Sequence, residues 1–328
     1  MIISYVGNRK NLASDGKSFN TENHIALTLE KLGHTVKFIQ EDSIPMIDLI
    51  GSVTGSDLFL WTRTWPGMMH EQYLRAIEDM GIPTASFHLD KYTGLERDGG
   101  LANGDPFWKT QYVFSPEGSD EAKRIFKSHG INQFYLPAGV FEDECYIAEP
   151  EIKYMHDIVF VGGGKQYAHK EWPYRAKLIQ WLEDTYGPRF KHYGWPDETI
   201  RGEELNKLYA SCKIVIGDSL CKDFKDEYYW SDRVFETTGR GGFIIHPYIV
   251  GIEDNFKIGS GKAQDDTELL TYAFGDFDQL KWLIDHYLQH DIERLEIRNN
   301  GHNRTKRDNT YTNRMAEMLN VLKKEGAL

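Results

Sequence analysis

The sequence predicts an α/β protein built from two Rossmann-like domains that face a central cleft. Short β-branched or aromatic runs alternate with amphipathic segments of helical length along most of the chain. The alternation pauses in an acidic, irregular stretch at 141–156 and then starts again. The chain has 328 residues, which fits two domains of about 150 residues better than one.

The individual elements follow from this alternation. In the first half, strands are expected at 2–6, 34–39, 57–62, 83–88, 111–115 and 133–137. In the second half, strands are expected at 157–162, 190–194, 213–217 and 242–247, and only helical patterns after about 276. A typical helix is expected from residue 21, with Ile25, Leu29 and Leu32 on one face and Gly33 at its end. The predicted domains are 1–148 and 149–312, with a helix at 313–328 that returns to the first domain.

Composition excludes several function classes. Lys and Arg number 38 against 50 Asp and Glu, so the net charge of −12 disfavours binding to duplex DNA, although a local basic segment at 302–314 remains an option. Three cysteines without a C-x-x-C pair indicate no disulfide framework. The N-terminus resembles neither a signal peptide nor a membrane span, and these features predict a cytoplasmic protein.

A glycine-rich turn follows the first strand of the second half. Gly162, Gly163 and Gly164 let backbone N–H groups approach an anion, and Lys165 adds positive charge. The turn is neither G-x-G-x-x-G nor a P-loop. The alternative is a flexible turn with solvated lysines.

The segment 213–247 carries a second group of candidates. Asp218 and Ser219 follow a strand, and Ser231 or Asp232 is placed to cap the next helix. Arg233 and Glu236 are three residues apart and share a face of that helix. The alternative is a capped surface helix with an exposed ion pair, but the position beside two strand ends favours a binding site.

The stretch S-D-R-V-F-E-T-T-G-R-G-G-F-I-I-H-P at 231–247 resembles the donor-binding half of GT-B glycosyltransferases, most closely the CgeB-like branch of the retaining group 1 type. G-H-N-R-T-K-R-D-N-T-Y-T-N-R at 301–314 also resembles that family, and the resemblance extends over about 157–314. In the family, a Glu at the position of Glu236 binds the donor ribose and the turn at 162–165 binds the diphosphate. The family pattern has a second Glu where this chain has Tyr228, so either the loop is shifted or Asp232 and Arg233 take over that role.

The resemblance implies a hexosyl- or pentosyltransferase with a UDP- or GDP-linked sugar as co-substrate and no other cofactor. Lys165 and Arg233 are expected to offset charge on the leaving diphosphate, and Asp218, Ser231 and Asp232 to line the donor site. No metal is expected, because the sequence lacks H-E-x-x-H, clustered Cys and His, and the D-x-D of the other large glycosyltransferase fold. The acceptor is left open among protein, glycan and a modified DNA base of a phage. The alternatives are a nucleotide-sugar epimerase and an inactive nucleotide- or sugar-binding protein.

The loop at 7–20 in the first half offers acceptor-side candidates. Ser14, Asp15 and Gly16 lie between the first strand and its helix, where they would contact the acceptor or a phosphate, or form a solvated loop. Arg63 and Trp65 follow the strand at 57–62, and the aromatic ring suits stacking on a sugar or base. Half-buried packing is the alternative for Trp65.

His88 and Asp90 come at the end of the strand at 83–88. In an inverting enzyme one of them would act as the general base that takes the acceptor's hydroxyl proton. A core histidine with a helix cap is the alternative interpretation.

Overall fold

The computed structural model describes residues 1–9, 20–42, 46–63, 69–95, 101, 104–165, 173–219, 227–261 and 266–328. It divides into two compact units. Unit 1 contains Met1–Phe141 and Tyr311–Leu328, and unit 2 contains Glu142–Thr310. The sequence-based boundaries are at 148 and 312, whereas the units divide after Phe141 and Thr310.

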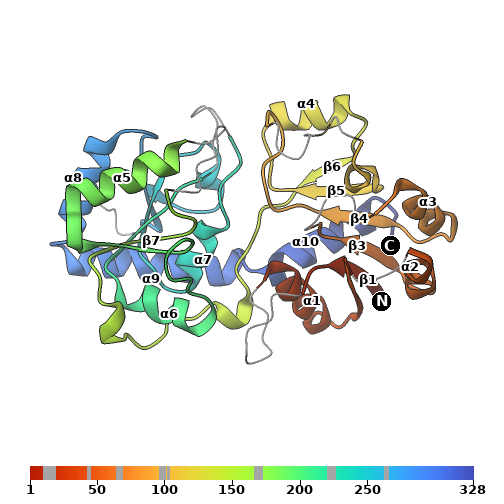
Figure 1. Cartoon of the computed structure of the whole chain (residues 1–328), viewed down its shortest axis with the longest axis horizontal. Coiled ribbons are helices and arrows are strands. Elements are labelled where there is room, and N and C mark those ends of the chain that lie inside the picture. The colour runs from red at the N-terminus through yellow and green to blue at the C-terminus, as the bar shows by residue number, and fades with distance from the viewer. Residues whose placement is uncertain are drawn as a thin grey trace. The chain divides into compact units, whose positions relative to one another are not determined.

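Unit 1 is a six-stranded parallel sheet in the order β2-β1-β3-β4-β5-β6 (Figure 1). Its strands are β1 Ile2–Gly7, β2 Thr35–Gln40, β3 Leu58–Trp61, β4 Thr84–Phe87, β5 Tyr112–Ser115 and β6 Gln133–Tyr135. Its helices are α1 Thr21–Lys31, α2 Met46–Val53, α3 Glu71–Asp79, α4 Asp120–Ser128 and α10 Tyr311–Lys324. Each of the six strands overlaps its predicted range.

Unit 2 is a second six-stranded parallel sheet, in the order β11-β12-β10-β9-β7-β8. Its strands are β7 Ile158–Val161, β8 Phe190–Tyr193, β9 Ile214–Ile216, β10 Ile244–Pro247, β11 Ile258–Gly259 and β12 Leu269–Tyr272. Its helices are α5 Tyr174–Tyr186, α6 Gly202–Ser211, α7 Arg233–Gly239, α8 Phe277–Tyr287 and α9 Asp291–Asp308. The two edge strands β11 and β12 were not anticipated from the sequence. The prediction of two α/β units with parallel sheets is confirmed.

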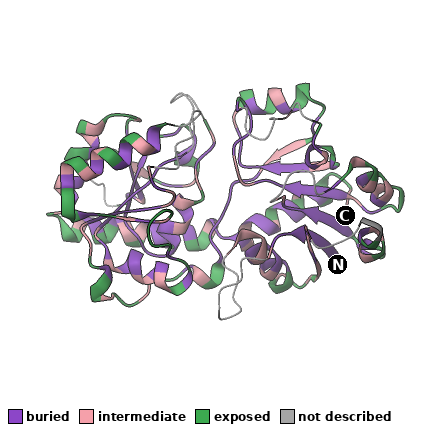
Figure 2. Cartoon of the chain, viewed as in Figure 1, coloured by how far each residue is buried: buried purple, intermediate pink, exposed green. Residues whose placement is uncertain are grey.

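Burial on both faces explains why the strands are continuous apolar runs. In β3, residues Leu58, Phe59, Leu60 and Trp61 are all buried, as expected for a parallel sheet covered by helices on both sides. The central strands of both sheets are buried throughout, whereas the helices show one buried and one exposed face (Figure 2). These sheets are rigid supports for whatever side chains follow their strands.

The last helix belongs to unit 1 although it follows unit 2 in the chain. Met315, Met318 and Leu322 of α10 are fully buried and share a hydrophobic cluster with Ile25 and Leu29 of α1. The chain therefore crosses from unit 1 to unit 2 and back. No helix in the described part of the chain is both long and apolar enough to cross a membrane.

Candidate active site

Three neighbouring strands of unit 2 end beside one another. Strand β9 lies between β7 and β10 in the sheet. The turn Gly162–Gly164 follows β7, Gly217, Asp218 and Ser219 follow β9, and β10 ends at Pro247. Because all three strands are parallel, these residues lie at the same edge of the sheet, where open α/β sheets bind ligands.

The carboxylate of Asp218 is the centre of this edge. It is buried, with 1% of its side chain exposed, and accepts hydrogen bonds from Nε of Arg175 at 2.6 Å and Nη1 of Arg233 at 2.5 Å. Burial disfavours the charged form, but the two guanidinium groups outweigh that effect and hold the pKa of Asp218 below its usual value. Asp218 is therefore an anion that orients two cations.

Arg233 is fixed by several acceptors and keeps one donor available. Its Nε donates to the carbonyl of Val161 at 2.6 Å, and its Nη1 donates to both the carboxylate and the carbonyl of Asp218. Its Nη2 has no acceptor among the described residues. A side chain at Gly162 would place Cβ 2.7 Å from Nη2, so this glycine makes room for the guanidinium.

His246 supports the same edge from β10. Burial lowers the pKa of His246 to about 4, so the ring is neutral near pH 7. Its Nδ1 donates to the carbonyl of Pro247 at 2.7 Å, which leaves Nε2 to accept from the hydroxyl of Ser219 at 3.0 Å. The same hydroxyl accepts the backbone N–H of Ser231 at 2.8 Å. This chain of hydrogen bonds fixes the start of the segment that leads into α7.

Of the two residues predicted to cap α7, Ser231 and not Asp232 makes the side-chain hydrogen bond. Asp232 is the residue before the first turn, but its carboxylate makes no capping bond to the helix. The hydroxyl of Ser231 instead accepts the N–H of Arg233 at 3.3 Å. Tyr228, which replaces the expected glutamate, has a positive φ of 51°. Its N–H donates to the carbonyl of Val250 at 2.8 Å, so the backbone at this position is attached to the loop after β10.

Glu236 lies in a separate ion-pair network. It accepts from Nε of Arg240 at 2.7 Å, and Arg240 also donates to Glu144 and to Asn206. Burial alone would lower the pKa of Arg240, but Glu236 and Glu144 raise it well above its usual value. The pairing of Arg233 with Glu236 that their spacing allows is not formed, because each has a more buried partner. Oε1 of Glu236 has no donor among the residues that the structure describes.

Lys165 at the end of the glycine turn points to α5. Its ammonium contacts the carboxylate of Glu183 at 2.6 Å and the side-chain oxygen of Gln180 at 3.2 Å. The N–H of Gly164 donates to the carbonyl of Trp195 at 2.7 Å. The predicted role of Lys165 at the diphosphate stays a prediction, and it requires the ammonium to leave Glu183.

Arg63 of unit 1 is buried in a polar contact at the end of β3. Its guanidinium pairs with the buried carboxylate of Asp105, and its Nη2 donates to the hydroxyl of Tyr92 at 2.8 Å. Four other predicted acceptor-side residues lie outside the described residues: Ser14, Asp15, Gly16 and Trp65.

His88 follows β4 and is buried among aromatic rings. Its ring centroid lies 4.4 Å from that of Trp108, 4.7 Å from that of Tyr92 and 5.0 Å from that of Phe107. Asp90 is half-buried two residues further on. The aromatic contacts account for the position of the ring, and the predicted roles of both residues stay predictions.

Sequence reasoning missed Arg175 and His246. Arg175 lies in the first turn of the helix after the glycine turn, and His246 is near the end of a predicted strand. The only sequence feature that could have identified them is that each lies close to the end of a predicted strand. Their common neighbour Asp218 becomes visible only from the strand order.

Residues 173–320, mostly within unit 2, match a family model described as "Glycosyl transferase-like". This match confirms the expectation that the chain is a glycosyltransferase. A search of curated proteins finds no match.

Solved structures resemble the whole chain. One is an α-glucosyltransferase in complex with UDP-glucose and DNA containing an abasic site, with a TM-score of 0.69 and 9% identity over 98% of each chain. Another is Anabaena Alr3699/HepE in complex with UDP-glucose, with a TM-score of 0.58 and 12% identity over 98% of this chain and 100% of that one. At such low identity these likenesses show the fold, which is the GT-B fold. The group 1 GT-B resemblance is thus confirmed, and the CgeB-like branch stays a prediction.

Proposed function

We propose that this chain is a retaining, metal-independent glycosyltransferase that transfers glucose or a related sugar from a UDP-linked donor to an acceptor hydroxyl. The observation that carries the proposal is the pair of arginines on the buried carboxylate of Asp218, at the strand edge of the glycosyl transferase-like unit. Two similar folds were solved with UDP-glucose, which supports UDP rather than GDP.

The arginine pair suits the leaving diphosphate. As the bond from the sugar's anomeric carbon to the diphosphate breaks, its electron pair moves to the phosphate oxygen, and the acceptor oxygen forms the new bond. Nη2 of Arg233 is a preorganised donor for that oxygen, because Val161 and Asp218 fix the guanidinium before the donor arrives. The acceptor's proton is proposed to leave with the diphosphate, as retention without a separate base requires.

Glu236 is proposed to bind the donor ribose through Oε1, since Oε2 is occupied by Arg240. Its side chain is 21% exposed, so one oxygen is within reach of a ligand. Gly162, Gly163 and Gly164 are proposed to hold the diphosphate, and Asp232 to line the donor site beside them. The enzyme is proposed to act in the cytoplasm, where the buried free thiols of Cys145 and Cys212 stay reduced.

The acceptor is the finer part of the proposal. One similar fold was solved with DNA, which keeps a modified DNA base among the candidates together with protein and glycan. The net charge of −12 opposes retention on duplex DNA. Retention on immobilised DNA that disappears as salt is raised would select the DNA acceptor.

The experiment is a transfer assay with UDP-glucose and a panel of DNA, glycan and protein acceptors, in EDTA and with added Mg²⁺. We expect UDP release that depends on one acceptor class and continues in EDTA, and a product with the anomeric configuration of the donor. An isomerised sugar formed from the donor alone would indicate an epimerase instead. UDP binding without turnover on any acceptor would indicate an inactive binding protein.

A further inference from the structure

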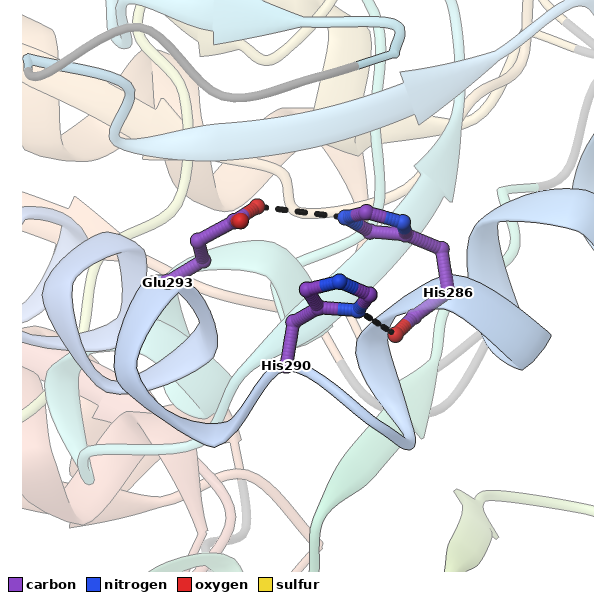
Figure 3. Close-up of side chains that lie close together, drawn as sticks. All are labelled: His286, His290 and Glu293. Carbon is purple, nitrogen blue, oxygen red and sulfur yellow. Dashed lines mark hydrogen bonds and ion pairs between the residues drawn. The ribbon is translucent and has the colours of Figure 1, made fainter.

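We propose that His286, His290 and Glu293 form a binding site for a transition-metal ion of the zinc class at the corner between α8 and α9. One ligand atom from each side chain lies within 4.8 Å of the others. The imidazoles of His286 and His290 stack with ring centroids 3.8 Å apart, and His286 also contacts Glu293 (Figure 3). None of them belongs to the candidate donor site. This site is structural and separate from transfer chemistry.

The local sequence brings the three ligands together. His286 lies in the last turn of α8, His290 directly precedes α9, and Glu293 lies in the first turn of α9. The chain reverses between the helices, so a span of eight residues places two imidazoles on one carboxylate. The sequence expectation of no metal did not weigh this group, although its two histidines have the i, i+4 spacing of H-E-x-x-H.

The hydrogen bonds of the two histidines show which ring nitrogens carry protons. Nδ1 of His290 lies 2.7 Å from the carbonyl of His286, and because a carbonyl only accepts, Nδ1 carries the proton and Nε2 presents a lone pair. A backbone carbonyl on the distal ring nitrogen is the usual partner of a metal-binding histidine. Nε2 of His286 contacts Oε2 of Glu293 at 3.1 Å. Because a carboxylate only accepts, this Nε2 carries a proton in the metal-free chain, and a metal that replaces the contact must displace that proton.

The geometry allows the ligands to close on an ion. Zinc ligands lie about 2.0–2.1 Å from the metal, which puts neighbouring ligand atoms about 3.3 Å apart. The three ligand atoms, which lie within 4.8 Å of one another, must therefore move closer together by up to about 1.5 Å to bind one ion. Glu293 has 40% of its side chain exposed and can rotate, whereas His286 stacks on Trp282 with ring centroids 5.3 Å apart. His290 is exposed, but it must leave its stack on His286, where the centroids are 3.8 Å apart, to bring Nε2 to the same ion.

Two imidazoles and one carboxylate favour zinc, nickel or copper over magnesium or calcium, which prefer oxygen ligands. Three protein ligands at a partly exposed corner bind more weakly than the four of a structural zinc site. We therefore expect a Kd on the order of 1–10 μM for zinc.

The test is calorimetric titration of Zn²⁺ into the full-length, tag-free chain after treatment with EDTA. We expect the wild type to show a micromolar site that is absent, or weakened at least about tenfold, in His290→Ala. Glu293→Gln should weaken the same site. Co²⁺ should give a visible absorption band in the wild type that His290→Ala loses.

His129→Ala is the matched control. His129 is also exposed at the end of a helix, and its Nδ1 lies 2.9 Å from the carbonyl four residues back, but it lies outside the cluster. This variant should bind Zn²⁺ as the wild type does. Equal uptake by the wild type and a folded His290→Ala, or an equal loss in His129→Ala, would overturn the proposal and leave the contacts as a helix-corner ion pair. Transfer assayed in EDTA reports on the proposed function separately.

Discussion

The two sheets are alike in topology and differ in the charges at the ends of their strands. In unit 2, one buried carboxylate, Asp218, is shared by Arg175 and Arg233. In unit 1, the buried guanidinium of Arg63 pairs with the carboxylate of Asp105, and a cluster of aromatic rings surrounds the neighbouring histidine. The first edge brings two guanidinium groups to one carboxylate, whereas the second shows one guanidinium on one carboxylate.

This difference supports different ligands for the two units. A pair of guanidinium groups at a buried edge attracts an anion such as a diphosphate, because low polarity strengthens the attraction. Aromatic rings beside an arginine–aspartate pair suit a neutral group such as a sugar or a base, which binds through stacking and hydrogen bonds. The proposed donor site is therefore in unit 2, and each prediction below tests that division.

Arg233→Ala should have the largest effect. Removal of a preorganised donor at the developing charge is expected to lower transfer by about 10²–10³-fold and to weaken UDP binding. Arg233→Lys should recover part of the rate, because it restores charge without the guanidinium fork. Initial rates and UDP titration give the measurements.

Arg189→Ala is the control for Arg233→Ala. Arg189 is also in unit 2 and pairs with an aspartate, Asp157, at 2.7 Å, but half of its side chain is exposed. Its removal should leave transfer unchanged. Equal rates for Arg233→Ala and Arg189→Ala would show that the guanidinium of Arg233 plays no part in the reaction.

The pH dependence of stability tests the buried histidine of unit 2. The pKa of His246 falls from 6.5 in the unfolded chain to about 4 in the folded chain, so the unfolded state binds more protons between these values. Stability is therefore lost as the pH falls from 6.5 to 4, by about 3 kcal/mol in total at about 1.36 kcal/mol per pH unit.

His246→Gln should remove this loss, because glutamine takes up no proton and its side-chain oxygen can still accept from Ser219. Urea unfolding at several pH values from 7 to 4 measures the slope for wild type and variant. His129→Gln, at an exposed position in unit 1, should keep the wild-type slope. The same slope in wild type and His246→Gln would contradict a neutral buried His246.

The sequence could predict most of the fold because buried parallel strands must be continuous apolar runs. It missed β11 and β12 at the sheet edge, and the apolar run of β12, Leu269–Tyr272, directly follows the acidic run 265–268. For the site, Asp218 and Arg233 were found because each lies beside a strand end. The pairing of Asp218 with Arg233 was not predicted, because contacts between residues far apart in sequence depend on the strand order. A buried carboxylate is also a stronger partner for Arg233 than a residue three positions along the helix.

Glu236→Gln separates stability from donor binding within unit 2. The change leaves the buried guanidinium of Arg240 with Glu144 as its remaining carboxylate, so we expect a loss of about 2 kcal/mol of stability. UDP affinity should also fall, because a neutral amide is a poorer acceptor for ribose hydroxyls. Denaturant unfolding and UDP calorimetry distinguish the two effects, and unchanged UDP affinity in the folded variant would remove Glu236 from the ribose site.

His88→Phe should have the smallest effect and bears on unit 1 alone. Phenylalanine retains the ring contacts with Trp108, Tyr92 and Phe107, so stability should change by less than about 1.5 kcal/mol. UDP affinity should not change, because the donor is assigned to unit 2. In a retaining reaction His88 is not the base, so we expect transfer to fall by less than about tenfold, whereas loss of a general base costs about 10²–10⁴-fold. A fall of that size with UDP affinity intact would make His88 the base and turn the reaction into an inverting one, and a weakened UDP affinity would contradict the division of ligands between the units.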